Sequence, residues 1–250
     1  MAHDYLELED GRRLAHVRIA GRGPWVVFLG GFRSDMSGTK ATYLEAWARA
    51  SGRAFLRFDY TGHGASSGRF EEGSIGDWAA DAEAAVGRLT DGPVVLVGSS
   101  MGGWIALLLA ARLDRVAGLV GIAAAPDFTE DLMWARATEA ERRDLAERGR
   151  IEVPSDYSDE PDVITRRLIE DGRERLVLRA PLALPFPVRL LHGAEDEDVP
   201  MSVALRLLEH AHSPDMQLTL VKGEGHRFST PERLAQIVAA IEAVAPLSAG

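Results

Sequence analysis

The sequence predicts an α/β protein whose mostly parallel central sheet, of about eight strands, carries helices on both faces. Three observations support this fold class. Apolar segments alternate with segments of helical period along most of the chain, which is the pattern of strand–helix–strand crossovers. The apolar segments are mostly unbroken, as in strands that are covered on both sides. One long stretch, 127–187, interrupts the alternation and predicts a small helical lid.

The strands are expected where short apolar runs occur. Two alternating runs, 6–9 and 14–19, flank Asp10-Gly11 and predict an antiparallel hairpin. Further strands are predicted at 25–29, 54–58, 94–97, 116–122, 188–191 and, from a weaker pattern, 217–221. Parallel strands joined by helices make right-handed crossovers, so these runs predict a single sheet.

The helices are expected between the strands, where apolar residues recur with helical spacing. The predicted helices span 40–50, 75–89, 102–112, 202–210 and 231–244. Pro231 suits the start of the last helix, because the first helical position needs no backbone N–H donor.

The stretch 127–187 is longer than a crossover between two strands requires. We therefore divide the chain into a core, 1–126 and 188–250, and a lid insertion, 127–187. Apolar side chains predict two amphipathic helices in the insertion, one with Leu132, Met133, Trp134 and Leu145, the other with Val163, Ile164, Leu168 and Ile169. Long structured loops at strand ends usually shape binding sites; a surface excursion without a functional role is the alternative.

Composition excludes several classes of protein. The 250 residues include no cysteine, which excludes a disulfide scaffold, a thiolate nucleophile and a cysteine-based zinc site. The formal net charge of −10 argues against nucleic acids and anionic membranes as partners. No membrane span and no apolar signal segment is visible, which predicts a cytoplasmic protein. The oligomeric state stays open.

Ser100 is the candidate nucleophile. It lies in Gly-Ser-Ser-Met-Gly at 98–102, a Gly-x-Ser-x-Gly motif that follows one predicted strand and opens a predicted helix. A serine hydroxyl attacks efficiently only when a sharp turn holds it within reach of a base, and glycines permit that turn. The motif alone is weak, and its place between strand and helix makes it specific. An incidental serine in a tight turn is the alternative.

His226 is the candidate base among the seven histidines. It stands in a loop after the last predicted strand, and the chain order that goes with such a serine turn is serine, acid, histidine. Asp196 is the candidate acid, because it follows the strand at 188–191. Asp127 is the rival, since it also follows a predicted strand. The neighbouring carboxylates are interpreted as solvated loop charges: Glu195, Glu197 and Asp198.

Two backbone N–H groups are candidates for an oxyanion hole, which stabilises the charge of a tetrahedral intermediate. One belongs to Met101, directly after the nucleophile, and the other to Phe32, in the loop after the strand at 25–29. Met133 and Trp134 of the insertion are candidate substrate-binding residues, because apolar side chains there predict an acyl pocket. His63 is a third, because its Gly-His-Gly loop is placed to flank the site.

No cofactor and no metal site is expected. Segment 31–40 ends in Gly-Thr-Lys, which reverses the lysine and threonine of a phosphate-binding loop. No Gly-x-Gly-x-x-Gly opens the first crossover, so no dinucleotide site is indicated. No two histidines share a helical face with a carboxylate, as a zinc site would need.

Together these motifs resemble the α/β-hydrolase superfamily over nearly the whole chain. Within it, the sequence is similar to the mitochondrial branch of acyl-protein thioesterases and acyl-glucuronide esterases. The residues that carry this second resemblance are Gly31-Phe32, Met36, Gly38-Thr39-Lys40-Ala41, Arg57-Phe58-Asp59-Tyr60, Gly98-Ser99-Ser100-Met101-Gly102-Gly103-Trp104 and Arg189-Leu190-Leu191-His192-Gly193. The resemblance implies an α/β-hydrolase fold, a triad of Ser100, Asp196 and His226, and small acyl esters or thioesters as substrates. The insertion departs most from the branch.

The expected reaction is acyl transfer to water, in which Ser100 attacks the acyl carbonyl while His226 takes its proton. A peptidase or a carbon–carbon bond hydrolase uses the same triad and is the alternative enzyme. A ligand-binding protein that retains the fold without catalysis is the less favoured alternative. The serine argues against dehalogenase and epoxide hydrolase chemistry, which needs aspartate at this position.

Overall fold

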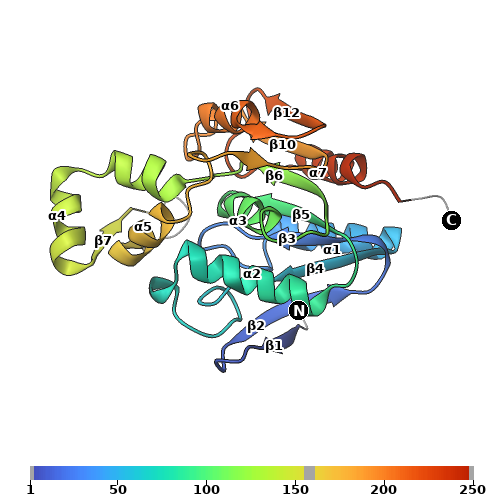
Figure 1. The fold of residues 1–250 in the computed structure, drawn as a ribbon, viewed down its shortest axis with the longest axis horizontal. Coiled ribbons are helices and arrows are strands. Elements are labelled where there is room, and N and C mark those ends of the chain that lie inside the picture. Colours follow the sequence, from blue (N-terminus) through green and yellow to red (C-terminus); the bar gives the residue numbers. More distant parts are fainter. Residues whose placement is uncertain (1–2, 155–160, 248–250) are drawn as a thin grey trace.

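The computed structural model describes residues 3–154 and 161–247. Its centre is an eight-stranded sheet with the strand order β1-β2-β4-β3-β5-β6-β10-β12 (Figure 1). The strands are β1 (Asp4–Glu7), β2 (Arg13–Ile19), β3 (Arg22–Leu29), β4 (Arg53–Phe58), β5 (Val94–Ser99), β6 (Val116–Ile122), β10 (Val188–Gly193) and β12 (Met216–Val221). β2 pairs antiparallel with β1 and β4, and the other pairs are parallel. The predicted fold class is confirmed.

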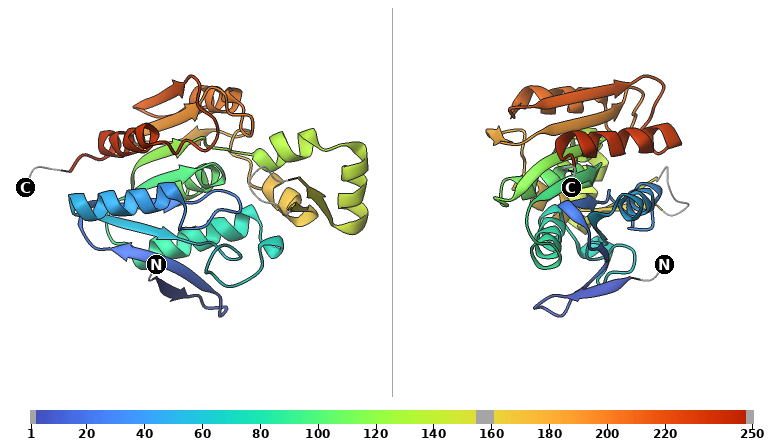
Figure 2. Two further views of the ribbon diagram at one scale, coloured as in Figure 1. Left: turned by 180° about the vertical axis from the view of Figure 1, so that it is seen from behind. Right: turned by 90° about the vertical axis from the view of Figure 1, so that its right-hand side faces the viewer.

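Helices cover both faces of the sheet (Figure 2). α1 (Thr39–Ser51) and α7 (Pro231–Val244) pack on one face, and α2 (Ile75–Leu89), α3 (Met101–Ala110) and α6 (Met201–His210) on the other. Side chains of β3 alternate between the two layers: Val26 and Phe28 join the core under α1 and α7, while Val27 and Leu29 join the opposite core. Because both faces are covered, the central strands are apolar at every position rather than at every second one.

The pairing register determines where the site forms. Leu29 of β3 pairs with Gly98 of β5, and Ile122 of β6 pairs with both Ser99 of β5 and Leu191 of β10. These parallel strands therefore end at the same edge of the sheet. In open α/β sheets, ligands bind outside the carboxyl ends of the strands, and the loops that follow these four strands carry most of the predicted site residues.

The segment between β6 and β10, called the insertion below (127–187), projects beyond this edge of the sheet (Figure 1). It contains a π-helix (Thr129–Trp134), α4 (Glu139–Arg148), a hairpin of β7 (Arg150–Val153) and β8 (Asp162–Thr165), α5 (Arg166–Arg173) and β9 (Leu182–Ala183), which pairs with β11 (Ala211–His212). A short 3-10 helix (Phe70–Glu72) lies in the core before α2. That the insertion acts as a lid stays a prediction.

The two helices expected in the insertion are only partly correct. The first is divided, because a capping box between Thr138 and Glu141 starts a new helix, so Leu132 and Leu145 lie on different elements. The second begins later than expected: Val163 and Ile164 belong to β8, and Thr165 caps α5. Short apolar runs fit a strand or a buried helix equally well. Within the part of the chain described, no helix is long and apolar enough to span a bilayer.

Candidate active site

Ser100 occupies a strained turn between β5 and α3. Its backbone has φ 54° and ψ −119°, a conformation that non-glycine residues rarely adopt. Hydrogen bonds on both sides hold it there: its N–H donates to Ile122 O (2.9 Å), and its carbonyl accepts from the N–H groups of Gly103 (2.9 Å) and Ala125 (3.0 Å). Such strain persists only where surrounding contacts fix it, and it is concentrated at functional sites.

The glycines of the motif allow the turn to be this tight. A Cβ atom on Gly98 would lie 2.3 Å from Gly102 O, and one on Gly102 would lie 2.1 Å from Leu29 O. Side chains at these two positions would push α3 away from β5 and β3. The sequence pattern therefore has a steric reason, and its result is a serine held at the start of a helix.

His226 connects Ser100 to Asp196. His226 Nε2 lies 3.0 Å from Ser100 Oγ, and Nδ1 lies 2.8 Å from Asp196 Oδ2. Asp196 is buried, and its other oxygen accepts the N–H of Val199 at 2.8 Å, which fixes the plane of the carboxylate. Buried His192 lies 3.5 Å from Asp196, and burial lowers its pKa, so it does not compete as a cation for the carboxylate.

Asp127, the rival acid, has a different set of partners. Its buried carboxylate accepts the N–H groups of Val177 (2.8 Å) and Leu178 (3.1 Å) and the guanidinium of Arg179 (2.5 Å). It therefore ties the start of the insertion to the segment that leads back to the core. The geometry favours Asp196 as the partner of His226.

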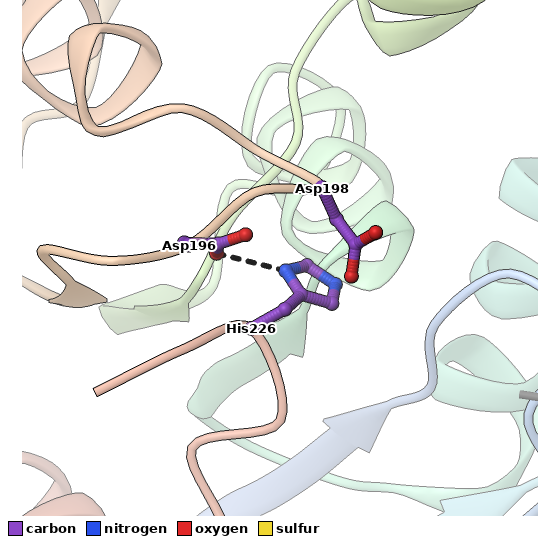
Figure 3. A group of neighbouring side chains, drawn as sticks. All are labelled: Asp196, Asp198 and His226. Atoms are coloured by element: carbon purple, nitrogen blue, oxygen red, sulfur yellow. Dashed lines mark hydrogen bonds and ion pairs between the residues drawn. The ribbon is translucent and has the colours of Figure 1, made fainter. Parts of the chain in front are cut away.

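Asp198 lies on the same loop as Asp196, and its carboxylate approaches the His226 ring (Figure 3). One ligand atom from each of Asp196, Asp198 and His226 falls within 4.8 Å of the others, a spacing that a metal ion also uses. Both ring nitrogens of His226 already have hydrogen-bond partners, however, and this arrangement fits proton transfer. Sequence reasoning missed Asp198, because nothing in a run of four loop carboxylates indicates which of them faces inward.

The two candidate oxyanion residues border the nucleophile. Met101 is the first residue of α3, next to Ser100, and is fully buried. Phe32 lines the same cavity as Ser100. Its ring packs edge-on against Phe70 (4.9 Å between centroids) and Phe128 (5.8 Å), which anchors the loop after β3. The use of their N–H groups as an oxyanion hole stays a prediction.

A cavity of about 790 Å³ opens over Ser100 and His226. The insertion supplies an apolar wall, formed by Phe128, Leu132, Met133, Ala137, Ile151, Val153 and Ile164. Charged side chains also line the cavity: Arg33, Lys40, Arg136, Glu141, Asp162, Asp198 and Arg227. The cavity therefore combines apolar and charged side chains, and the insertion supplies both kinds.

Of the three predicted substrate-binding residues, only Met133 lines the cavity. Trp134 does not, because its indole lies between the guanidinium groups of Arg142 (4.9 Å) and Arg173 (4.5 Å). Adjacent residues of a helical turn point in different directions, and the sequence does not say which one faces a ligand. The sequence analysis also missed Ile151 and Val153, which reach the cavity from the unexpected hairpin.

His63 is likewise not a substrate contact. It is buried and packs edge-on against Tyr60, Phe70 and Trp78, with ring centroids 5.1 to 5.4 Å away. Burial lowers its pKa to about 4, so the ring is neutral at neutral pH. His63 is thus part of the aromatic core beneath the Phe32 loop, one layer away from the cavity.

A parallel sheet, a strained serine at the end of a central strand, and a histidine held between that serine and a buried aspartate define an α/β hydrolase. Residues 26–237 match the model of the alpha/beta hydrolase family, and the chain belongs to that family.

Curated relatives and solved structures show which members of the family the chain is similar to. It is 35% identical over 240 residues to the mitochondrial palmitoyl-protein thioesterase ABHD10 of Rattus norvegicus, which covers 95% of this chain and 80% of that protein. It is also similar to the solved structure of mouse alpha/beta hydrolase domain-containing protein 10 (TM-score 0.90, 32% identity, 98% of both chains). A solved protein of Agrobacterium vitis S4 matches with a TM-score of 0.92 and 41% identity over 97% of this chain and 98% of that one. The resemblance to the thioesterase branch is confirmed.

The expected cytoplasmic location is contradicted by this comparison, because the curated relatives are mitochondrial proteins. The expectation depended on the lack of an apolar signal segment. Mitochondrial targeting segments are amphipathic and arginine-rich, not apolar, so that observation does not distinguish the two compartments.

Proposed function

We propose that this α/β hydrolase cleaves acyl thioesters or carboxylic esters through an acyl-enzyme intermediate on Ser100. The observation that carries the proposal is the hydrogen-bonded series Asp196–His226–Ser100 beneath a cavity with an apolar wall. The similarity to a palmitoyl-protein thioesterase supports the same class of reaction.

In the proposed reaction, Ser100 Oγ attacks the acyl carbonyl while His226 Nε2, 3.0 Å away, takes its proton. Asp196 stabilises the imidazolium through Nδ1. The N–H groups of Met101 and Phe32 stabilise the tetrahedral oxyanion. His226 then gives the proton to the departing sulfur or oxygen. In the second half, water loses a proton to His226 as it attacks the acyl-enzyme, and the carboxylic acid leaves as Ser100 Oγ regains that proton.

The apolar wall favours an acyl chain over a peptide as the group bound next to Ser100. A chain that enters between Leu132, Met133 and Ile164 is removed from water, and each buried methylene contributes about 0.8 kcal/mol. A peptide would place unpaired backbone polar groups against the same wall, which costs free energy. No observation in the cavity favours carbon–carbon bond hydrolysis.

The test is labelling of the protein by a fluorophosphonate probe together with hydrolysis of p-nitrophenyl octanoate and octanoyl thioesters. Ser100→Ala should abolish labelling and reduce hydrolysis below about one per cent of the unmodified protein, because loss of a nucleophile costs several powers of ten. Ser99→Ala is the matched control, since Ser99 lines the same cavity and the hydrogen bond of His226 Nε2 goes to the neighbouring Ser100. Equal labelling of the Ser100→Ala variant, or labelling lost only with Ser99→Ala, would contradict the assignment.

A further inference from the structure

Lys40 is a cation at a position in the fold that does not favour positive charge. It is the second residue of α1 and lines the cavity that holds Ser100 and His226. Its Nζ donates a hydrogen bond to Arg227 O at 2.6 Å. Among residues 3–154 and 161–247, no carboxylate lies at ion-pair distance from this ammonium, and Arg227 is the charged group that acts on it.

Three effects make this position unfavourable for a cation. The amino-terminal end of a helix carries partial positive charge, so a lysine in the first turn of α1 is destabilised. Lys40 is half-buried, so part of the water that would solvate the ammonium is excluded, and Arg227 adds a second positive charge nearby. Together, burial first and Arg227 second, they lower the pKa of Lys40 to about 8. An anion bound in the cavity would offset all three effects.

The position of Lys40 relative to His226 indicates which part of a substrate it meets. The apolar wall of the cavity comes from the insertion, which also contributes Arg136, Glu141 and Asp162 to the lining. Lys40 comes from the core, and its Nζ is hydrogen-bonded to the carbonyl of the residue that follows His226. The acyl chain occupies the apolar side. The leaving group must lie beside His226, because His226 protonates its sulfur or oxygen. The leaving group therefore also lies on the side of Lys40.

We propose that Lys40 is a specificity residue that binds an anionic group, a carboxylate or a phosphate, carried by the leaving thiol or alcohol of the substrate. This proposal rests on the proposed ester or thioester hydrolysis. The ammonium has two N–H groups left after its bond to Arg227 O, enough to donate to two oxygens of such a group. Hydrogen bonds between ionised partners are the stronger kind.

The test uses three octanoyl thioesters that differ only in the thiol: 3-mercaptopropanamide (neutral), 3-mercaptopropanoate (carboxylate) and 2-mercaptoethyl phosphate (phosphate). Thiol release gives kcat/KM for each. The unmodified protein should cleave at least one anionic thioester about tenfold faster than the neutral one, as expected for one charge-assisted hydrogen bond. Which anionic thioester is preferred distinguishes a carboxylate from a phosphate.

The variants separate charge recognition from a structural role. Lys40→Met removes the charge at similar length and should bring the anionic-to-neutral ratio close to one, while Lys40→Arg should keep the preference. Loss of the hydrogen bond to Arg227 O would disturb His226 and slow the hydrolysis of all three thioesters by the same factor. The ratio of kcat/KM for the anionic and neutral thioesters would therefore not change. Lys222→Met is the matched control, because Lys222 is the second of the chain's two lysines and is exposed. Lys40→Gln replaces Lys40→Met if the latter does not fold.

Two kinds of failure are distinguishable. If the unmodified protein cleaves the neutral thioester and shows no anionic preference, or if Lys40→Met keeps the preference, the role of Lys40 is wrong and the hydrolase proposal stands. If none of the three thioesters, nor p-nitrophenyl octanoate, is cleaved, the proposed function itself fails, and the role of Lys40 fails with it.

Discussion

The contacts of the two carboxylates favour Asp196 over Asp127 as the acid of the proposed triad. Asp196 accepts from His226, so Asp196→Asn removes the counter-charge and favours the wrong tautomer of the imidazole, which should lower kcat about a thousandfold or more. Asp127→Asn should leave kcat within a few-fold. It should instead lower the free energy of unfolding by about 1 to 3 kcal/mol, because Asp127 satisfies two buried N–H groups and Arg179. Measurements of kcat and of urea unfolding for both variants test this prediction. A small loss of kcat in Asp196→Asn together with a large loss in Asp127→Asn would reverse the assignment.

His63 makes the fold sensitive to acid. Its pKa is about 4 in the folded protein and 6.5 in the unfolded chain, so the unfolded chain binds more protons between these values. Stability is therefore complete above pH 6.5 and is lost as the pH falls towards 4. Between pH 7 and pH 5, the free energy of unfolding should fall by about 2 kcal/mol less in the His63→Gln variant than in the unmodified protein. His16 and His192 also have pKa values lowered by burial. Their contribution to the pH dependence of stability is the same in the unmodified protein and in the His63→Gln variant. Equal pH dependence of urea unfolding in both would contradict the prediction.

At the scale of elements, the π-helix of the insertion presents Met133 to the cavity and Trp134 to two arginines. For p-nitrophenyl esters, kcat/KM should rise with chain length from acetyl to octanoyl, and four further buried carbons should give roughly a hundredfold. Met133→Ala should flatten this slope. Trp134→Ala should lower the melting temperature and leave the slope unchanged. A flat slope in the unmodified protein would remove the acyl pocket, and a flattened slope only in Trp134→Ala would place the pocket on the other side of the helix.

The elements also show what the sequence could and could not predict. The strands and helices of the core were predictable because burial on both faces leaves apolar runs such as 94–97, and because the turn at Ser100 needs glycines at fixed places. The β7–β8 hairpin was not, since its apolar residues are few and its pairing is decided by contacts outside the run. The inward direction of Asp198 and the exclusion of Trp134 depend on side-chain orientation, which sequence spacing does not record. Lys40 was not predicted to line the cavity, because an isolated lysine is ordinarily a solvated one.

At the scale of the whole molecule, the sheet brings together site residues that are far apart in the sequence. Ser100 and His226 are 126 residues apart and Asp196 and His226 are 30 apart, yet β5, β10 and β12, the strands that precede them, end at the same edge of the sheet and bring them together. The insertion extends that edge and supplies most of the apolar wall of the cavity. The sheet therefore positions Ser100, Asp196 and His226, and the insertion lines the cavity above them.

The sequence distance between Ser100 and His226 has a consequence for how the protein refolds. Contacts between distant residues form slowly, because a long loop of chain must be closed before they stabilise anything. We expect His226 to reach Ser100 only after β10 and β12 have joined the sheet, because the loop that carries His226 follows β12 and β12 pairs with β10. Reactivity towards a fluorophosphonate should therefore return later than helical circular dichroism when the chain is diluted from urea. The rate at which probe labelling returns would then report the last step of folding. Simultaneous recovery of labelling and circular dichroism would instead show that the sheet forms in a single step.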